Sequence, residues 1–270
     1  MSASAIRSRW RPSPLLFASA GVHGGAAAVM LAQSALWPWA VGALAANHAL
    51  LTAAGLSPRS RLLGPNCTRL PAAGPAQVAL TLDDGPDPEV TPQVLEMLAA
   101  HGARATFFCI GERVAAHPAL AREILANGHA IENHSQRHLH YFSVLGPRRL
   151  QAEIERAQET IGATTGAAPR FFRAPAGLRS PLLDPLLQRL GLQLASWTRR
   201  GFDTVEGRPA RVLAALLRDL SAGDILLLHD GHAARTSAGT PVVLEVLPKL
   251  LGAFAAARLA PVTLREAFGA

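Results

Sequence analysis

The sequence predicts an α/β protein in which a closed or nearly closed barrel of seven parallel strands follows an N-terminal hairpin of hydrophobic helices. Two observations predict the barrel. Short apolar runs alternate with stretches of helical periodicity from residue 76 onward, and acids, histidines and an arginine stand where the runs end. Two long apolar segments near the N-terminus predict the hairpin. With 49% hydrophobic residues among 270, the chain can bury one well-packed core beside this appendage.

The expected strands and helices alternate along the chain. Each apolar run has the length of a strand, and five of the helical segments begin at a proline, which favours the first turn of a helix. Strands are expected at residues 77–82, 105–110, 129–132, 170–173, 192–197, 224–229 and 261–264. Helices are expected at residues 92–102, 115–126, 147–161, 181–190, 209–220 and 241–257.

The first part of the chain is predicted to lie in a membrane. Residues 15–31 and 37–56 are mostly apolar, and each is close to the roughly 20 residues that a bilayer span requires. Trp37 and Trp39 suit the interfacial belt of a membrane protein, and a turn is expected at 33–38. The chain therefore divides into a membrane segment of two paired helices, a Pro- and Gly-rich linker and an α/β domain, at residues 1–56, 57–75 and 76–270.

Arginines flank the hydrophobic segments and predict their orientation. Arg7, Arg9 and Arg11 precede the first segment, Arg59 and Arg61 follow the second, and the connection between the segments carries no Lys or Arg. The positive-inside rule then puts both ends in the cytoplasm, with the α/β domain at the inner leaflet of the cytoplasmic membrane. A signal peptide or single anchor, which would place the domain in the periplasm, is the alternative, although no convincing small-x-small cleavage site follows.

The net charge of +7 is compatible with an anionic partner such as a membrane surface or a phosphorylated lipid. Nucleic acid is not an expected partner, because the positive charge is nearly all scattered arginine, Lys249 is the only lysine, and no nucleic-acid-binding motif is present. Cys67 and Cys109 form neither a disulfide framework nor a C-x-x-C metal pair, so they leave the compartment open.

Residues able to do acid–base and metal chemistry follow the predicted strands. Asp83 and Asp84 follow the first strand, and His134 and His138 follow the third. Because the carboxyl ends of parallel barrel strands meet at one mouth, we expect these side chains to converge. Three further strand ends contribute Arg173, Asp203 and His229.

A metal site is the chemistry that this set favours. On a helical turn, the spacing of His134 and His138 would bring both imidazoles to one side of an ion, and a carboxylate would complete three ligands and leave room for water. The histidine spacing alone is weak, because with His140 nearby it equally describes a solvated turn. The adjacent acids Asp83 and Asp84 could also form a turn or helix cap, but two neighbouring like charges favour a nearby cation.

Four segments together resemble the polysaccharide deacetylase, or NodB-homology, family. They read TLDDGP at 81–86, HSQRH at 134–138, RAPAG at 173–177 and LLHD at 227–230. They occur in the family's order, and the resemblance covers roughly residues 76–268. The first two segments together are specific, and the other two support them.

The resemblance implies a distorted β/α barrel and metal-dependent deacetylation of amino sugars or related acylated carbohydrates. By this likeness Asp84, His134 and His138 hold a divalent metal ion, for which zinc is the first expectation. Asp83 would be the general base, oriented by Arg173. His229 would be the general acid, with Asp203 as its partner. Further candidate substrate contacts are Pro175, Trp197, Arg200 and Leu227.

One segment departs from the family pattern. Residues 197–204 read WTRRGFDT, so that Arg200 replaces an expected acid and Thr204 the usual Trp, which leaves Asp203 as the carboxylate partner of the acid histidine. Leu82 and Glu132 also stand where Phe and Gly are common. These changes bear on the substrate more than on the reaction. Arg199 or Arg200 could contact a phosphate or carboxylate of the substrate, a hypothesis motivated by their position at the mouth.

The sequence therefore predicts a membrane-tethered deacetylase acting on a carbohydrate or glycolipid, either a lipid-linked or another cell-envelope amino sugar. Two alternatives remain open. The same barrel could hydrolyse the amide or ester of another small acylated substrate, or the chain could be a catalytically silent membrane protein that binds carbohydrate. The presence of Asp83 favours an enzyme, because ligand binding alone needs no base.

Overall fold

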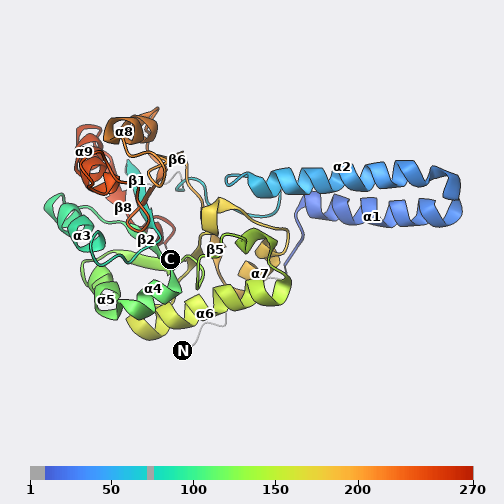
Figure 1. Ribbon diagram of the computed structural model, residues 1–270, viewed down its shortest axis with the longest axis horizontal. Helices are drawn as coiled ribbons and strands as arrows, with labels where there is room; N and C mark the ends of the chain where they lie inside the picture. The colour runs from blue at the N-terminus through green and yellow to red at the C-terminus, as the bar shows by residue number, and fades with distance from the viewer. Residues whose placement is uncertain (1–9, 72–75, 270) are drawn as a thin grey trace.

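The protein consists of an α/β domain from which a long helical hairpin projects to one side (Figure 1). The structure is a computed structural model and describes residues 10–71 and 76–269. It confirms the expected fold class, a curled parallel sheet covered by helices and preceded by two apolar helices.

A parallel sheet forms the centre of the domain. Its strands run in the order β5-β4-β3-β2-β1-β7-β6, and β8 pairs with the start of β1. The central strand β1 spans Gln77–Asp83. The other strands are β2 (Thr106–Cys109), β3 (Ala130–Asn133), β4 (Phe171–Phe172), β5 (Gln193–Leu194), β6 (Arg199–Arg200), β7 (Ile225–His229) and β8 (Ala260–Val262).

The two faces of β1 are chemically different because successive side chains of a strand point to opposite sides. Val78, Leu80 and Leu82 pack outward into the largest apolar cluster, against the helices. Thr81 and Asp83 face the inside of the curl, beside their register partners on β7. The strand therefore ends with a carboxylate on the inner face.

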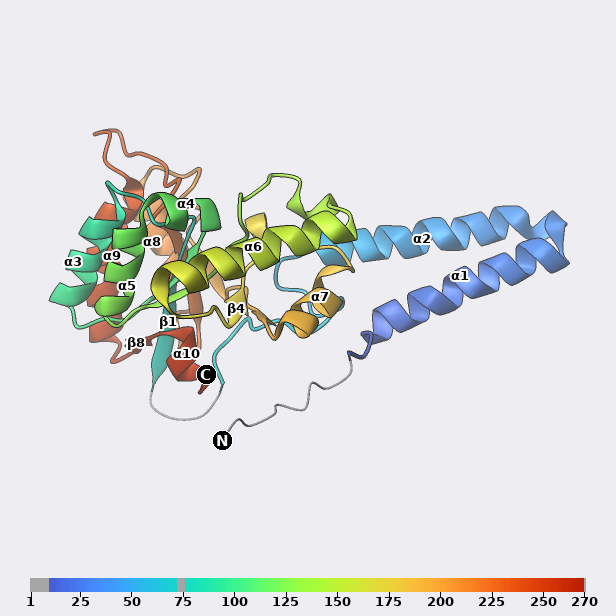
Figure 2. The same ribbon diagram turned by 90° about the horizontal axis from the view of Figure 1, so that it is seen from below.

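Helices cover the outer face of the sheet. Side chains of α3, α5, α8 and α9 join the outer apolar cluster, and α3, α5 and α9 lie together on the side away from the hairpin (Figure 2). The helices of the domain are α3 (Thr91–Ala100), α4 (Gly111–Ala116), α5 (Pro118–Ala126), α6 (Pro147–Thr165), α7 (Leu183–Leu190), α8 (Pro209–Leu217), α9 (Val242–Ala256) and α10 (Leu264–Ala267).

Three elements differ from the sequence prediction. The helix expected at 115–126 is two helices, because Pro118 begins α5 and the chain breaks at His117. The last strand ends at Val262, since the side chain of Thr263 caps α10. Strand β6 was not predicted, because its two arginines form no apolar run.

The segment after the hairpin fills the gap between the two edge strands. Within the described residues β5 and β6 do not pair, so the sheet curls without closing. Cys67 donates its backbone N–H to Leu194 O at 2.9 Å, and Ser196 donates its own to Cys67 O at 2.9 Å. The Thr198 hydroxyl donates to Thr68 O at 2.7 Å. The expected linker thus packs against the domain over these residues.

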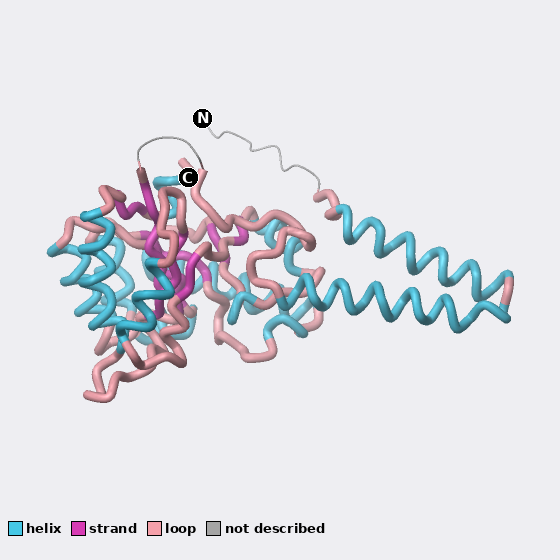
Figure 3. The backbone as a smooth tube through the Cα atoms, turned by 90° about the horizontal axis from the view of Figure 1, so that it is seen from above, coloured by secondary structure: helices cyan, strands magenta, loops and turns pink. Residues whose placement is uncertain are grey.

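The hairpin consists of α1 (Pro14–Ala32) and α2 (Trp37–Leu56), joined by the 3-10 turn Ser34–Leu36 (Figure 3). Both helices are long and apolar enough to cross a membrane. Polar side chains of the two helices contact one another: the buried Asn47 donates to the buried Ser19 hydroxyl at 2.9 Å, and the Nε2 atoms of His23 and His48 lie 3.3 Å apart. Polar groups matched between helices are compatible with an apolar surrounding.

Candidate active site

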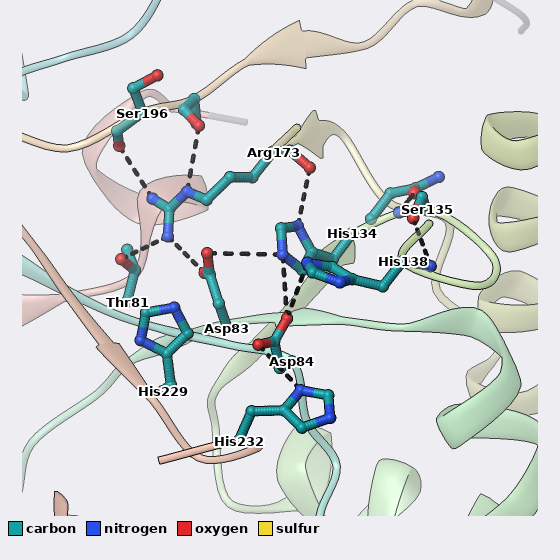
Figure 4. A network of polar contacts seen from close by, with 12 residues as sticks. Thr81, Asp83, Asp84, His134, Ser135, His138, Arg173, Ser196, His229 and His232 are labelled. Atoms are coloured by element: carbon teal, nitrogen blue, oxygen red, sulfur yellow. Dashed lines mark hydrogen bonds and ion pairs between the residues drawn. The ribbon is translucent and has the colours of Figure 1, made fainter. Parts of the chain in front are cut away.

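The neighbours Asp83 and Asp84 direct their carboxylates to different partners (Figure 4). Asp83 is the last residue of β1, whereas Asp84 adopts a left-handed backbone conformation with φ 72°. This turn separates the two side chains. Asp83 contacts Arg173, and Asp84 faces a group of histidines.

Asp84, His134 and His138 form a cluster suited to a cation. Oδ1 of Asp84 lies 3.3 Å from Nε2 of His134 and 3.3 Å from Nε2 of His138, and it is buried without a hydrogen-bond partner in the described residues. The three ligand atoms all lie within 4.8 Å of one another. Tetrahedral ligands about 2.0–2.2 Å from one ion would lie roughly 3.3–3.6 Å apart, so the set fits a metal.

The loop after β3 positions the side chains of His134 and His138. The prediction that these two residues lie on a helical turn was wrong. Ser135 and His138 adopt positive φ values of 65° and 51° and lie outside any helix. The Ser135 hydroxyl accepts the backbone N–H of His138 at 3.0 Å. Nδ1 of His134 contacts Arg173 O at 2.8 Å, which orients Nε2 toward Asp84. The imidazoles converge because of this loop rather than helical spacing.

The protonation of the cluster suits metal ligation. Burial disfavours ionisation of Asp84, but the neighbouring imidazoles of His134 and His232 hold the pKa of its carboxyl well below the usual range. Burial and the neighbouring His134 lower the pKa of His138 to about 4, so this imidazole is neutral. For His134 burial opposes protonation, but the charges of Asp83 and Asp84 raise its pKa. A cation would replace that proton.

Arg173 is buried and holds Asp83. The side chain is 1% exposed, so Arg173 is not a surface arginine at a strand end. Its NH1 donates to Oδ1 of Asp83 at 2.6 Å and to the Thr81 hydroxyl at 2.8 Å, while NH2 donates to Ser196 O at 2.9 Å. The guanidinium also lies 4.0 Å above the Phe108 ring. This network fixes the predicted base in one orientation.

His229 lies beside Asp83 and is paired with Asp203. Residues 83 and 229 are register partners in neighbouring strands, so their side chains share the inner face. Oδ1 of Asp203 lies 2.9 Å from Nδ1 of His229, and Oδ2 accepts its backbone N–H at 2.7 Å. Burial opposes protonation of His229, but the buried Asp203 carboxylate raises its pKa to about 9. The imidazole therefore carries a proton at neutral pH.

The predicted substrate contacts differ in accessibility. Pro175, Trp197 and Leu227 are buried, and Trp197 packs 5.8 Å from the Arg173 guanidinium. Arg200 is half-buried and lies over the rings of Trp197 and Phe202. Their contact with substrate stays a prediction.

Only one of the two arginines considered for an anionic substrate group is available. Arg199 is held by the Asp224 carboxylate and by backbone oxygens of Arg218 and Asp219. Its register partner Leu226 faces the outer apolar cluster. Arg200 pairs with Leu227, whose side chain faces inward.

Two contacts at the site were missed in the sequence. Nδ1 of His232 lies 3.3 Å from Oδ2 of Asp84, and the Thr81 hydroxyl accepts a hydrogen bond from Arg173. Alternation along the first strand places Thr81 on the face of Asp83 and could have indicated it. The sequence signal for His232 was its position three residues after His229, with Gly231 between them.

The comparisons with known proteins agree with the resemblance. A family model for polysaccharide deacetylase matches residues 72–195. The peptidoglycan-N-acetylglucosamine deacetylase of Bacillus cereus is 34% identical over 175 residues, which make up 64% of this chain and 81% of the relative. The chitooligosaccharide deacetylase of a Bradyrhizobium species is 36% identical over 161 residues, covering 59% of this chain and 73% of the relative.

Solved structures show the same fold. The family 4 carbohydrate esterase from Streptomyces lividans, solved in complex with acetate, superimposes with a TM-score of 0.63 at 30% sequence identity, over 70% of this chain and 93% of that chain. Fold, motifs and relatives agree, and the chain belongs to the polysaccharide deacetylase family of hydrolases that act on N-acetyl groups of sugars.

Proposed function

We propose that the protein is a membrane-anchored, metal-dependent deacetylase of an amino sugar in a cell-envelope polysaccharide or lipid-linked saccharide. One observation carries the proposal: Asp83 is held by Arg173 between the cluster of Asp84, His134 and His138 on one side and the protonated His229 on the other. The relatives named for peptidoglycan-N-acetylglucosamine and chitooligosaccharide support an acetylated amino sugar as the substrate class.

Asp84, His134 and His138 would hold the metal, and zinc is our first choice because two imidazoles and a carboxylate suit it, as they suit other divalent transition metals. When bound, such an ion polarises the acyl carbonyl and lowers the pKa of a water molecule. The unpartnered, buried Oδ1 of Asp84 supports this assignment.

The side chains around the cluster supply the proton transfers. Asp83 takes a proton from the water whose oxygen forms the new bond to the acyl carbon. Arg173 keeps Asp83 ionised and oriented through the 2.6 Å hydrogen bond. His229 donates a proton to the amide nitrogen as the carbon–nitrogen bond breaks. The products are acetate and the free amino sugar.

The anchor is proposed to be the helical hairpin within residues 1–56, with residues 57–75 connecting it to a catalytic domain at residues 76–270. Two helices of spanning length and matched polar contacts between them support an anchor. We place the catalytic domain at the cytoplasmic face of the inner membrane on the basis of the flanking arginines. A bilayer tether would raise the effective concentration of membrane-bound substrates.

A substrate panel tests the proposal. Full-length protein loaded with zinc should release acetate and free amine in equal amounts from N-acetylated amino sugars, and Asp83→Asn should lower the rate by about 100-fold or more while metal content is unchanged. Acetate release without amine would indicate an ester substrate. Equal rates for Asp83→Asn and wild type would refute the enzymatic role and favour a carbohydrate-binding protein.

A further inference from the structure

A second cleft opens beside the candidate active site, between the end of α2 and strand β6. Its volume is about 370 Å³. It is lined by Ser57, Pro58, Arg59, Trp197, Thr198, Arg200 and Phe202. This lining includes two arginines and no acid, so the cleft is basic.

The cleft and the candidate active site share the Trp197 side chain as a wall. The Trp197 ring lies 5.8 Å from the guanidinium carbon of Arg173 and 5.6 Å from that of Arg200. Arg173 holds Asp83 on the active-site side. Arg200 is the register partner of Leu227, whose side chain shares the inner face with His229 two residues later. A ligand group bound at Arg200 would therefore be next to the reacting sugar.

The charge of Arg200 is held in place but is not neutralised. Its guanidinium lies 5.0 Å from the Phe202 ring centroid, which fixes the side chain by cation–π contact. Its Nε is buried without a hydrogen-bond partner, and it forms no ion pair with any carboxylate in residues 10–71 or 76–269. The neighbouring Arg199 provides the contrast, because Asp224 neutralises it.

Arg59 brings a second positive charge to the same cleft. It donates from NH1 to Thr198 O at 3.1 Å and, within the described part of the chain, has no carboxylate partner either. Two guanidiniums around one cleft repel each other unless an anion lies between them. Planar guanidinium forks match the oxygens of a phosphoryl group, to which they can donate in pairs.

The position of the cleft on the chain indicates where that anion comes from. Arg59 follows Leu56, the last residue of α2, by three positions, so the cleft lies at the domain end of the proposed anchor. The end of a membrane-spanning helix lies near the lipid headgroups, which carry phosphate, so the proposed anchor would bring the cleft close to lipid phosphates. Since the cleft shares a wall with the active site, a phosphate here could belong to the same molecule as the sugar being deacetylated.

We propose that Arg59 and Arg200 bind the phosphoryl group of the substrate, an amino sugar joined through phosphate to a membrane lipid. This inference rests on the proposed deacetylase function and specifies its substrate class. The phosphate is bound and is not chemically changed. The cleft positions the acetylated sugar, so that the arginines contribute to substrate affinity rather than to proton transfer.

Matched substrates test the proposal on full-length, zinc-loaded protein in nanodiscs of zwitterionic lipid. One substrate is N-acetylglucosamine joined to a decyl chain by a phosphodiester, and the other is the decyl glycoside without phosphate. Arg200→Gln and Arg59→Gln should each lower kcat/KM for the phosphodiester by about 10- to 100-fold, mainly through KM, and that for the glycoside by less than about twofold. Arg156→Gln, an exposed position on α6, is the charge-matched control and should behave as wild type.

A second measurement separates the proposed deacetylase function from the proposed phosphate site. It is calorimetric binding of the deacetylated phosphodiester and the deacetylated glycoside, which cannot be hydrolysed further. Tighter binding of the phosphodiester that Arg200→Gln weakens, with no acetate released from either substrate, would refute the deacetylase function and keep the phosphate site. Acetate release without any preference for the phosphodiester, or equal losses on both substrates, would refute the phosphate site alone. If anionic phospholipid in the nanodisc abolishes the preference, the cleft binds a bilayer headgroup and the proposal is wrong.

Discussion

The pairing of His229 with Asp203 shows how a buried histidine can keep its proton. The Asp203 carboxylate is fully buried and accepts hydrogen bonds from both the ring and the backbone of His229. Burial alone would release the proton, but the nearby negative charge outweighs it and raises the pKa to about 9. The proposed acid for the leaving amine would thereby keep its proton throughout the neutral range.

The pH dependence of acetate release should reflect this pair. Because His229 must be protonated to act as an acid, kcat/KM should fall as the pH rises through about 9. Asp203→Asn removes the charge that raises the pKa, so the alkaline limb of the profile should move to lower pH. The measurement is kcat/KM against pH for both proteins, with circular dichroism to check folding. If the alkaline limb of a folded Asp203→Asn variant lay at the same pH as that of the wild type, His229 would not be the acid that this limb reports.

The sequence predicted which residue types would gather at the site because few side chains perform this chemistry. Asp84, His134 and His138 converge as expected, since parallel strands end at one edge. Alternation along the first strand places Thr81 on the face of Asp83, but it does not show that Arg173 is the partner of the threonine hydroxyl. The sequence places His232 close to His229, but its contact with Asp84 depends on how the loop after β7 folds.

At the scale of elements, apolar runs predicted the interior strands and the edge strand β5, but missed β6 at the other edge. β7 is a fully apolar run before its terminal His229, and β1 is mostly apolar before its terminal Asp83; the bounds of both strands are close to those expected. β6 consists of two arginines that pair with β7 through the backbone, and a pattern of side chains does not predict such backbone pairing. The contacts of Cys67 and Thr68 with the sheet edges likewise depend on backbone groups, so a segment predicted as a linker packs against the domain.

The 3-10 turn at Pro175–Gly177 joins the site to the end of the hairpin, and Gly177 is required there. It has φ 74°, and a Cβ at this position would lie 2.6 Å from Trp197 Cη2 and 2.7 Å from Pro58 Cβ. Gly177→Ala should therefore lower the free energy of unfolding by about 1–3 kcal/mol and displace the indole. Gly162→Ala on α6, where nothing lies within 4 Å, should be neutral or stabilising.

Denaturant unfolding measures both glycine variants, and near-ultraviolet circular dichroism reports the tryptophan environment. If Gly177→Ala were as stable as Gly162→Ala, the close packing of Trp197 against the segment after the hairpin would be wrong.

In the whole molecule, hydrogen bonds connect the hairpin with the candidate active site. The Ser196 hydroxyl donates to Pro58 O at 2.7 Å, just after α2, and the Ser196 carbonyl accepts from Arg173 at 2.9 Å. Arg173 in turn holds Asp83. Backbone N–H of Arg179 also donates to Gly55 O at 3.1 Å, near the end of the helix. The proposed anchor thus meets the domain close to the site, as suits a substrate held in a membrane.

A topology reporter tests the proposed anchor. Fused after Ala270, it should report the cytoplasm, because arginines flank both outer ends of the hairpin. The same reporter inserted in the turn at Ser34 should report the opposite side and serves as the matched control. Both reporters on one side would contradict two spans, and a periplasmic C-terminal reporter would contradict the orientation.

The most direct test of the central claim is the metal content of purified protein, measured with acetate release in the same preparations. If Asp84, His134 and His138 bind one catalytic cation, wild type should contain about one divalent metal ion per chain, and His134→Ala should lose both the ion and the activity. His140→Ala, an exposed neighbour outside the cluster, should retain both. Wild-type activity in a metal-free His134→Ala protein would contradict the claim.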